Sequence, residues 1–591
     1  GAHNTAEFDI SSFVVEGENE ILALVHKWSS ATFVECQDMF RENGIFRDVL
    51  LYKLNKTHIN DYQIRSTKID GLWYLTAELE LAGDTEACEI VAEIFDGNNL
   101  LAKKTIAAGK DVKIQFSDLN AQEWNAEIPK LYDLYFTLVK DSKEIESIRN
   151  YTGFKYIEIK NEVFTFNGKN IKLKGVNHHD THEKNGYVMT FDELERDVVL
   201  MKEFNVNTVR TSHYPPDPHL ISLCDKYGLY VVDEADIETH GAQVHPHYSL
   251  NLISGDRKWS PRYVDRVSRM YYRDRNHTSI IMWSLGNEAG GFECQDDCYT
   301  FLKKVSPEIP VHYEGVIHTP RHSYDVVSEM YTGIDKLAEV RDGTRGRKYQ
   351  NKPFYLCEYC HAMGVGPGAL EEYWNMFYSS DIFMGGCIWE WADHAVLHEK
   401  GDLRYTYGGD HGERKHDGNF CVDGLMYPDR TPHTGALVMK TVYRPIRARY
   451  EQNGEVFFRN TNDFKNSDYL TIKWSLTEDG KEIQEGSLKL NLAPGEEQNV
   501  SFDLKAFSAF CDYHLNFIYL DESGHEVAKE QLELRKNYLF TLTESDDTPE
   551  VADTEDKLTF NYNDIVLVFD KQKATLVSYK QNGNELINDK P

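Results

Sequence analysis

Two carboxylate residues stand at the ends of apolar runs that are typical of buried strands. Glu288 ends the run IIMWSLGNE, residues 280–288, and Glu358 lies near the end of FYLCEY, residues 354–359. A buried carboxylate is costly unless it is paired or used. Two opposed carboxyl groups can carry out glycoside hydrolysis, because one protonates the leaving oxygen while the other attacks the anomeric carbon or activates water.

Other polar side chains occur at the same relative position after further apolar runs. They are His178, His179, His213, Glu234, Glu238, His240, Asn287, Glu314, Glu329, Tyr331, His361, Trp389 and Asp393. Each one alone could equally cap a helix or form an ion pair, but the recurrence indicates a site at one end of the strands. Asn287 could donate a hydrogen bond to a sugar hydroxyl, and Trp389 offers an apolar face to a pyranose ring.

These side chains need a scaffold that brings the strand ends together. Eight apolar runs between residues 171 and 391 are separated by crossovers, and three of those crossovers have helical spacing. The predicted strands are 171–177, 206–213, 229–236, 280–288, 310–315, 325–331, 354–359 and 385–391, and the predicted helices are 191–205, 216–228 and 261–276. Such strands are typical of a parallel sheet buried on both faces, so we expect a (β/α)₈ TIM barrel over residues 160–448. An open doubly wound sheet is the alternative, but no glycine-rich phosphate loop follows the first strand.

The segments on either side of this barrel read as β-structure. Period-two alternation in TAEFDISSFVV, EILALVHKW, WYLTAELELAG and LYDLYFTLVKD predicts strands. We expect residues 1–50 to be part of a jelly-roll domain and residues 51–159 and 449–541 to be immunoglobulin-like β-sandwiches. Residues 542–591 read as an acidic, poorly ordered linker, a strand pair and the start of a further sandwich. The predicted fold class is therefore a multidomain protein that combines α/β and all-β parts, with a central barrel flanked by β-sandwich domains.

Composition limits the classes of partner. The chain of 591 residues carries a formal charge of −32 and no long run of Lys and Arg. This argues against nucleic acid or an anionic membrane as partner and is compatible with a neutral small molecule. No run of about 18 apolar residues predicts a membrane span, and no signal peptide is recognised, although a start without Met leaves a processed or truncated N-terminus open. The ten scattered Cys suit a reducing compartment, so we expect a cytoplasmic protein.

Six segments carry a family resemblance. They are GVNHHDTH, TVRTSHYPPDP, LYVVDEADIETHG, DRNHTSIIMWSLGNEAG, CEYCHAMGVGPG and YGGDHGE…FCVDGL. With these segments the chain resembles the β-galactosidases of glycoside hydrolase family 2, and the resemblance extends over essentially all 591 residues. It implies hydrolysis of terminal β-D-galactose from lactose-like substrates.

The resemblance also implies catalytic roles. Glu358 corresponds to the nucleophile and Glu288 to the general acid/base of a retaining double displacement, and Tyr331 corresponds to a tyrosine that supports the nucleophile. The two carboxyl groups of a retaining enzyme lie roughly 5–5.5 Å apart. We expect Glu288 to have a raised pKa in the free enzyme, so that it first acts as an acid and then as a base.

Metal and sugar sites follow from the same resemblance. A magnesium site is implied at Glu238, His240 and Glu288, and a possible sodium site at Asp38, the backbone of Phe420, and Asp423, where the family has Asn. The family's sugar-contacting residues correspond to Asp38, His179, His213, Asn287, His361 and Trp389. His178 stands where the family often has Arg, which predicts changed contacts near the pocket rim.

The ends of the chain depart from the longer family members. Residues 1–10 match the middle of the family's jelly-roll domain, and residues 542–591 match only the start of a large terminal sandwich. We therefore expect either a fragment or a chain completed by another polypeptide, such as a small subunit. By analogy with large multi-sandwich enzymes, a homo-oligomer is also expected. Two alternatives to β-galactosidase stay open: a β-glucuronidase or β-mannosidase of the same family, and a carbohydrate-binding fragment without turnover.

Overall fold

The computed structural model describes residues 3–40, 42–240, 251–398, 404–451, 454–508, 511–536 and 547–587. Contacts divide the chain into two units. The first comprises Gly1–Thr477, Glu482–Lys505 and His514–Glu533, and the second comprises Glu478–Lys481, Ala506–Tyr513 and Leu534–Pro591. Among the described residues, no helix is long and apolar enough to cross a lipid bilayer.

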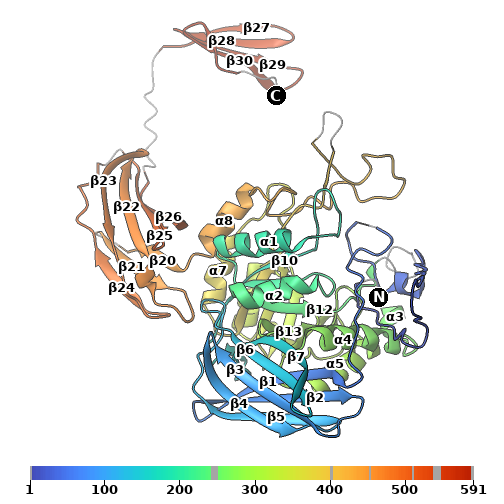
Figure 1. Ribbon diagram of the computed structural model, residues 1–591. Coiled ribbons are helices and arrows are strands. Elements are labelled where there is room, and N and C mark those ends of the chain that lie inside the picture. The colour runs from blue at the N-terminus through green and yellow to red at the C-terminus, as the bar shows by residue number, and fades with distance from the viewer. Residues whose placement is uncertain are drawn as a thin grey trace. The chain divides into compact units, whose positions relative to one another are not determined.

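The first unit is built around a parallel barrel, which Figure 1 shows with helices around it. Within the described ranges, eight strands form one sheet in the order β14-β13-β12-β11-β10-β17-β16-β15. They are β10 (Leu173–His178), β11 (Thr208–Thr211), β12 (Tyr230–Glu234), β13 (Ile280–Ser284), β14 (Val311–His312), β15 (Val327–Met330), β16 (Phe354–Tyr359) and β17 (Phe383–Ile388). At the seam between β14 and β15, the Asp325 amide donates a 3.0 Å hydrogen bond to the Val311 carbonyl. The predicted TIM barrel and all eight of its strands are confirmed.

Local sequence signals set the ends of the barrel helices. A capping box of Thr190 and Glu193 starts α1 (Phe191–Glu203). Asp217 caps α2 (Pro218–Tyr227), and Gly228 ends it with a left-handed φ of 81°, which glycine adopts without strain. The remaining α-helices of the described chain are α3 (Asn251–Ser254), α4 (Ser260–Asp274), α5 (Glu293–Val305), α6 (Ile334–Arg341), α7 (Leu370–Tyr378) and α8 (Thr434–Val442). The three predicted helices correspond to α1, α2 and α4.

The barrel strands are buried almost without interruption, because helices cover one face and the interior fills the other. One apolar cluster joins the barrel interior to β8 (Ile157–Lys160) and β9 (Val163–Phe166), an antiparallel pair that contributes Phe164 and Phe166. A second cluster lies between strands and helices. Burial on both faces explains why these strands read as continuous apolar runs. It also leaves the strand ends as the natural positions for polar side chains.

A β-sandwich precedes the barrel, as predicted. Residues 57–155, all of which the structure describes, form a three-stranded sheet, β1-β2-β5, and a four-stranded sheet, β4-β3-β6-β7. The strands are β1 (His58–Ile69), β2 (Leu72–Ala82), β3 (Cys88–Asp96), β4 (Asn99–Ala107), β5 (Asp111–Leu119), β6 (Tyr132–Lys140) and β7 (Lys143–Thr152). Alternate residues point into a shared core, as in β2, where Trp73, Leu75 and Ala77 are buried.

A second pair of sheets follows the barrel. In the described part of residues 446–535, the strands form the sheets β20-β21-β24 and β23-β22-β25-β26. They are β20 (Ile446–Tyr450), β21 (Glu455–Asn460), β22 (Thr471–Glu478), β23 (Lys481–Leu488), β24 (Glu497–Ser501), β25 (Tyr513–Leu520) and β26 (Glu526–Arg535). The remaining short elements of the first unit are β18 (Val396–Leu397), β19 (Tyr405–Thr406), η1 (Ser30–Phe33), η3 (Gly315–His318), η4 (Arg347–Tyr349) and η5 (Ser467–Tyr469).

The N-terminal segment differs from the prediction. Residues 3–40 and 42–57 contain no strand, so the strands expected at 5–15 and 20–28 are wrong. Their apolar side chains are exposed, as Phe8 at 82% and Leu22 at 90% show. A strand needs a neighbour to pair its amides and carbonyls, and the described residues supply none here. Alternation alone therefore did not decide the structure of this segment.

The second unit also departs from the prediction at its beginning. Its described residues contain a five-stranded antiparallel sheet in the order β27-β28-β29-β30-β31. The strands are β27 (Glu550–Asp553), β28 (Lys557–Tyr562), β29 (Ile565–Asp570), β30 (Thr575–Gln581) and β31 (Asn584–Glu585). The predicted pair corresponds to β29 and β30, but β27 lies inside the expected linker, 543–557, of which residues 543–546 lie outside the described ranges. Pairing with β28 orders an acidic stretch that has low strand propensity by itself.

Candidate active site

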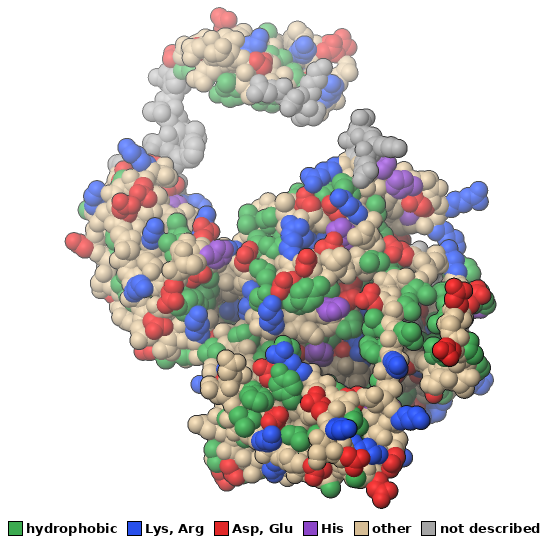
Figure 2. Space-filling model, in the orientation of Figure 1, with side chains coloured by type: hydrophobic (Ala, Val, Ile, Leu, Met, Phe, Trp, Pro, Cys, Tyr) green, Lys and Arg blue, Asp and Glu red, His purple; other side chains and the backbone are tan. Residues whose placement is uncertain are grey.

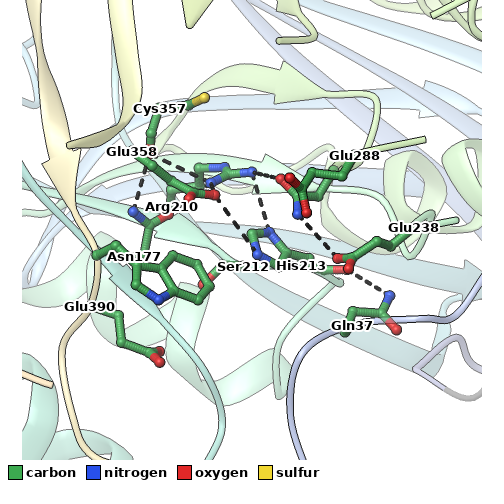
Figure 3. Close-up of polar contacts among 12 residues, drawn as sticks. Gln37, Asn177, Arg210, Ser212, His213, Glu238, Glu288, Cys357, Glu358 and Glu390 are labelled. Atoms are coloured by element: carbon green, nitrogen blue, oxygen red, sulfur yellow. Dashed lines mark hydrogen bonds and ion pairs between the residues drawn. The ribbon is translucent and has the colours of Figure 1, made fainter. Parts of the chain in front are cut away.

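The carboxyl ends of the barrel strands gather the predicted residues. Arg210 lies in β11, Glu234 ends β12, and Glu358 lies in β16, while Glu288 follows β13 by four residues. Figure 3 shows Glu358 and Glu288 on opposite sides of His213 in that view, with Arg210 close to Glu358. The sequence-based expectation that the two carboxylates share one site is consistent with this arrangement.

Glu358 is held by hydrogen bonds at both of its oxygens. Nη1 of Arg210 lies 2.8 Å from Oε1, and the Tyr331 hydroxyl donates a 2.9 Å hydrogen bond to Oε2. Nε2 of His213 lies 3.9 Å from Oε1. The Glu358 side chain is only 7% exposed. Its partners therefore fix the carboxylate in one orientation at the barrel mouth.

Arg210 is the central donor of the site and is fully buried. Its Nε and Nη2 bind the two oxygens of Glu234 at 2.8 and 3.0 Å, a bidentate pair that orients the guanidinium. Nη1 also donates to Oδ1 of Asn177 at 3.0 Å, and Nη2 donates to Oδ1 of Asn287 at 3.1 Å. Burial would raise the pKa of Glu234, but Arg210 and His213 lower it to about 2.

His213 and Trp389 form a stacked pair beside the two carboxylates. Their ring centroids are 5.0 Å apart and the rings are nearly parallel, at 8°. Nδ1 of His213 lies 2.7 Å from Oε1 of Glu234. Burial by itself would lower the pKa of His213, but the hydrogen bond to Glu234 raises it above the ordinary value. Both rings are buried at the ends of the barrel strands, next to Glu358.

Glu288 has a different environment from Glu358. Its backbone φ is 36°, and its amide donates a 2.8 Å hydrogen bond to Oε1 of Glu314. Nδ1 of His240 lies 2.7 Å from its Oε2. Burial would raise the pKa of Glu288, but the hydrogen bond to His240 and its charge lower it below the ordinary value. The expected raised pKa is therefore wrong for this arrangement, because a cationic partner outweighs desolvation.

Glu238, His240 and Glu288 form a group with ligand atoms within 4.8 Å of one another. Burial and the charge of Glu288 are the influences that raise the pKa of Glu238, to about 7, while the hydrogen bond to Glu288 raises the pKa of His240 to about 9. Nδ2 of Asn287 donates a 3.1 Å hydrogen bond to Oε2 of Glu238. Two neighbouring carboxylates with one imidazole make a donor set that suits a divalent cation, since a cation relieves their mutual repulsion. The predicted magnesium ligands fit such an ion.

A second group of this kind was not predicted. His179, Glu390 and His394 are buried together, and one ligand atom of each lies within 4.8 Å of the others. Nδ1 of His179 lies 2.7 Å from Oε2 of Glu390, and Nε2 of His394 lies 3.3 Å from the same oxygen. Only His179 of these three had been assigned a role from the sequence.

The residues expected to hold sodium lie on two loops, Asp38 on one and Phe420 and Asp423 on the other. Asp38 is exposed, and its charge acts on both His240 and His361. The ring of Phe420 lies 5.7 Å from that of His361. Asp423 is buried, and its Oδ2 accepts a 2.8 Å hydrogen bond from Nε1 of Trp389. Burial, followed by the charge of Glu390, raises the pKa of Asp423 well above its ordinary value.

Several strand-end residues turn out to have other partners. Glu329 lies 2.9 Å from Nη2 of Arg345. His178 is buried and lies 3.1 Å from Oδ2 of Asp197, so the expectation that it alters the pocket rim is wrong. Asp197 is a buried residue of α1, so His178 contacts a helix of the barrel. The sequence does not show which strand-end side chains face the site and which pair elsewhere. Strands that are buried on both faces lack the alternation of apolar and polar residues that would mark one face.

Sequence reasoning missed the network that surrounds Glu358. Glu234 and Glu314 were noted at strand ends without a role, and Asn177, Arg210 and Glu390 were not selected as site residues. Position was the available signal, because Asn177 and Arg210 both fall within predicted barrel strands, 171–177 and 206–213. Gln37 was missed as well: it comes from the N-terminal segment and donates a 3.1 Å hydrogen bond to the His213 carbonyl.

Family models match most of the chain. "Glycosyl hydrolases family 2, sugar binding domain" matches residues 1–55, "Glycosyl hydrolases family 2" matches residues 57–155, and the "TIM barrel domain" of the same family matches residues 157–448. "Beta-galactosidase, domain 4" matches residues 456–535. The second of these matches encloses β1 to β7, and the third encloses all eight barrel strands.

Curated relatives are similar over nearly the whole chain. A beta-galactosidase of Pectobacterium atrosepticum is 37% identical over 84% of this chain and 50% of its own length. One of Kluyveromyces lactis is 35% identical over 99% of this chain and 61% of its own length. The chain thus spans about half to three fifths of the length of these relatives.

Solved structures share the fold. A β-galacturonidase from Eisenbergiella tayi aligns with a TM-score of 0.55 at 20% identity, over 71% of this chain and 78% of that one. A β-D-glucuronidase of Dictyoglomus thermophilum aligns with a TM-score of 0.56 at 21% identity, over 68% and 71%. With three domain models of one family matching in consecutive order, the chain belongs to glycosyl hydrolase family 2.

Proposed function

We propose that the protein is a retaining β-galactosidase that removes terminal, non-reducing β-D-galactose from lactose-like substrates. The observation that carries the proposal is the placement of Glu358, which Arg210 and Tyr331 hold at the barrel mouth that Glu288 also faces. The relatives named beta-galactosidase support the choice of sugar.

In the first step, a carboxylate oxygen of Glu358 attacks the anomeric carbon while the bond to the leaving oxygen breaks. Glu288 gives its proton to that oxygen, and a covalent glycosyl-enzyme forms. In the second step, Glu288 takes a proton from water, the water oxygen bonds to the anomeric carbon, and Glu358 is released. Arg210 and Tyr331 keep Glu358 aligned through both steps.

Glu238, His240 and Glu288 would hold Mg²⁺. The bound ion would supply positive charge beside Glu288 and compensate the repulsion between the two carboxylates. Nδ1 of His240 cannot both carry the proton that pairs with Glu288 and bind a cation. A bound ion would therefore take the place of the His240 proton as the positive partner of Glu288.

We assign sugar binding to Asp38, His179, His213, Asn287, His361 and Trp389, and a sodium site to Asp38, the Phe420 carbonyl and Asp423. The stacked rings of Trp389 and His213 provide the apolar wall that a pyranose face requires. We further propose a cytoplasmic protein that works as a homo-oligomer or together with a small subunit. Light scattering and intact mass of the purified protein test that assembly.

Arg210 bears on the alternative of a glucuronide substrate, because a sugar carboxylate needs a cation. All three nitrogens of Arg210 already donate to Glu234, Glu358, Asn177 or Asn287. The side chain is fully buried and has no donor to spare. The strand ends therefore favour a neutral sugar over a uronic acid.

Initial rates on aryl β-D-galactoside, β-D-glucuronide and β-D-mannoside test the proposal. We expect hydrolysis of the galactoside to dominate, and Glu358→Gln to lower its kcat by about 10⁵-fold or more. Glu195→Gln is the matched control, since Glu195 pairs with Lys226 at the surface. A faster rate on either other glycoside, or sugar binding with no hydrolysis at all, would overturn the proposal.

A further inference from the structure

His179 lies in the site with one of its two nitrogens already engaged. Nδ1 is 2.7 Å from Oε2 of Glu390, and the Ser212 hydroxyl lies 3.5 Å from the same nitrogen. Nε2 is buried and has no hydrogen-bond partner among the described residues. A contact from His179 to a substrate would therefore be made through Nε2.

The protonation of this pair follows from its surroundings. Burial lowers the pKa of His179 to about 3, although Glu390 works against this. Burial would raise the pKa of Glu390, but His394 and His179 lower it well below the ordinary value. A neutral imidazole beside a carboxylate carries its single proton on the nitrogen that faces the carboxylate.

We propose that Glu390 is a positioning residue that fixes His179 as the Nδ1–H tautomer, so that Nε2 accepts a hydrogen bond from a hydroxyl of the sugar. This inference rests on the proposed function, because it assumes that His179 meets the glycoside. A buried acceptor without a partner is unfavourable. A sugar hydroxyl at Nε2 relieves this cost, which gives substrates that carry the hydroxyl an advantage.

His394 supports the same arrangement from the other side. Its Nε2 lies 3.3 Å from Oε2 of Glu390, so that one carboxylate oxygen receives hydrogen bonds from two imidazoles. The His179 and His394 rings meet edge to face, with centroids 4.6 Å apart. His394 thus holds Glu390 in place for His179.

The same three residues could instead hold a transition metal such as zinc. Histidines that bind metals almost always donate their outer N–H to a second group. The outer nitrogens here are Nε2 of His179 and Nδ1 of His394, and neither has a partner among the described residues. The contacts therefore favour the hydrogen-bonded arrangement.

The test compares wild type with Glu390→Gln on aryl β-D-galactoside and on its singly deoxygenated analogues. The amide introduced by Glu390→Gln can present its N–H₂ to Nδ1 of His179, which moves the imidazole proton to Nε2 and removes the acceptor. We expect kcat/KM on the parent glycoside to fall roughly 10- to 100-fold. The loss should nearly disappear on the one analogue that lacks the hydroxyl bound by His179, whereas a general structural defect would lower all rates alike.

A double-mutant cycle with His179→Gln shows whether Glu390 acts through His179. The amide introduced by His179→Gln offers an oxygen near the position of Nε2 and has no tautomer, so Glu390→Gln should cost less than about threefold in that background. Glu390→Asp keeps the carboxylate and should recover part of the rate. Glu195→Gln, which changes only the surface pair with Lys226, serves as the control.

Equal losses on every analogue, or full additivity with His179→Gln, would overturn the inference. So would one equivalent of zinc in the purified full chain, measured by elemental analysis, that is lost in Glu390→Gln. Failure of the proposed function looks different, because wild type would then show no preference for the galactoside at all. The melting temperature of each variant identifies any that fail to fold.

Discussion

The Arg210 guanidinium donates a 2.8 Å hydrogen bond to Oε1 of Glu358 from the interior of the barrel. The donor is fully buried and the acceptor nearly so, which makes this a charge-assisted contact in a region of low dielectric. Glu234 completes the arrangement by binding the other two nitrogens of Arg210. The positive charge that supports the proposed nucleophile thus comes from β11, which β10 and β17 separate from β16 in the sheet.

Replacing Arg210 by Met should impair both folding and activity. The change leaves Glu234 and Glu358 as buried carboxylates without their cation, which costs about 3–5 kcal/mol of unfolding free energy. Urea unfolding of wild type and variant measures the loss. Arg257→Met is the control, because Arg257 pairs with Asp297 at the surface and should contribute about 1 kcal/mol or less. Equal stability of the two variants would contradict the role given to Arg210.

Tyr331→Phe should lower the rate of catalysis without lowering the stability of the protein. The hydroxyl donates to Oε2 of Glu358 at 2.9 Å, while the residue is 45% exposed. We expect kcat to fall roughly 10²- to 10³-fold, as for other lost donors at a reacting oxygen, with little change in melting temperature. Tyr405→Phe removes a similar hydroxyl bond, to Glu183, and should leave kcat unchanged. An active Tyr331→Phe variant would exclude this tyrosine from the mechanism.

The acid stability of the protein should depend on Glu234. Its pKa is about 2 in the folded chain against an ordinary 4.5, so its contribution is fully present above pH 4.5 and is lost as the pH falls toward 2. A shift of this size corresponds to about 3 kcal/mol. The free energy of unfolding of wild type should exceed that of Glu234→Gln at pH 7, and the gap should narrow below pH 4.5. A gap that stays constant with pH would show that the pair with Arg210 does not shift this pKa.

Removal of Mg²⁺ with a chelator should abolish the activity, and addition of Mg²⁺ should restore it. Glu238 is buried beside Asn287 and contributes one of the two carboxylates of the group. Glu238→Gln should weaken Mg²⁺ binding by roughly 10- to 100-fold, because even the loss of a group that only hydrogen-bonds to a metal ligand has an effect of this size. Titration calorimetry on the full chain measures the binding. Glu195→Gln should bind the ion as wild type does. Calorimetry that detects no Mg²⁺ binding to wild type would remove this site from the proposal.

Surface charge agrees with a small neutral substrate. On the face that Figure 2 shows, Lys and Arg side chains are interspersed with Asp and Glu rather than gathered into one basic area. The formal charge of −32 has the same sign as nucleic acid. The electrostatic field of the protein does not steer an uncharged galactoside toward the site. We therefore expect kcat/KM for the galactoside to change little with salt concentration.

The barrel could be predicted because parallel strands buried on both faces read as continuous apolar runs. Glu288 and Glu358 were recognisable for the related reason that a carboxylate is unexpected at the end of such a run. Alternation at residues 5–15 and 20–28 predicted strands that did not form, since pairing depends on a neighbour that the local pattern does not specify. Conversely, β27 formed in an acidic stretch because β28 lies beside it.

The sequence by itself determined the family, the barrel and which carboxylates stand at strand ends, because these depend on residue type and on the period of burial. Only the tertiary structure decided how those groups are paired. Arg210 reaches Glu358 across 148 positions of the chain, and Glu390 reaches His179 across 211. It also decided that His240 lowers the pKa of Glu288, since a pKa depends on the neighbours in space and not on the position in the chain.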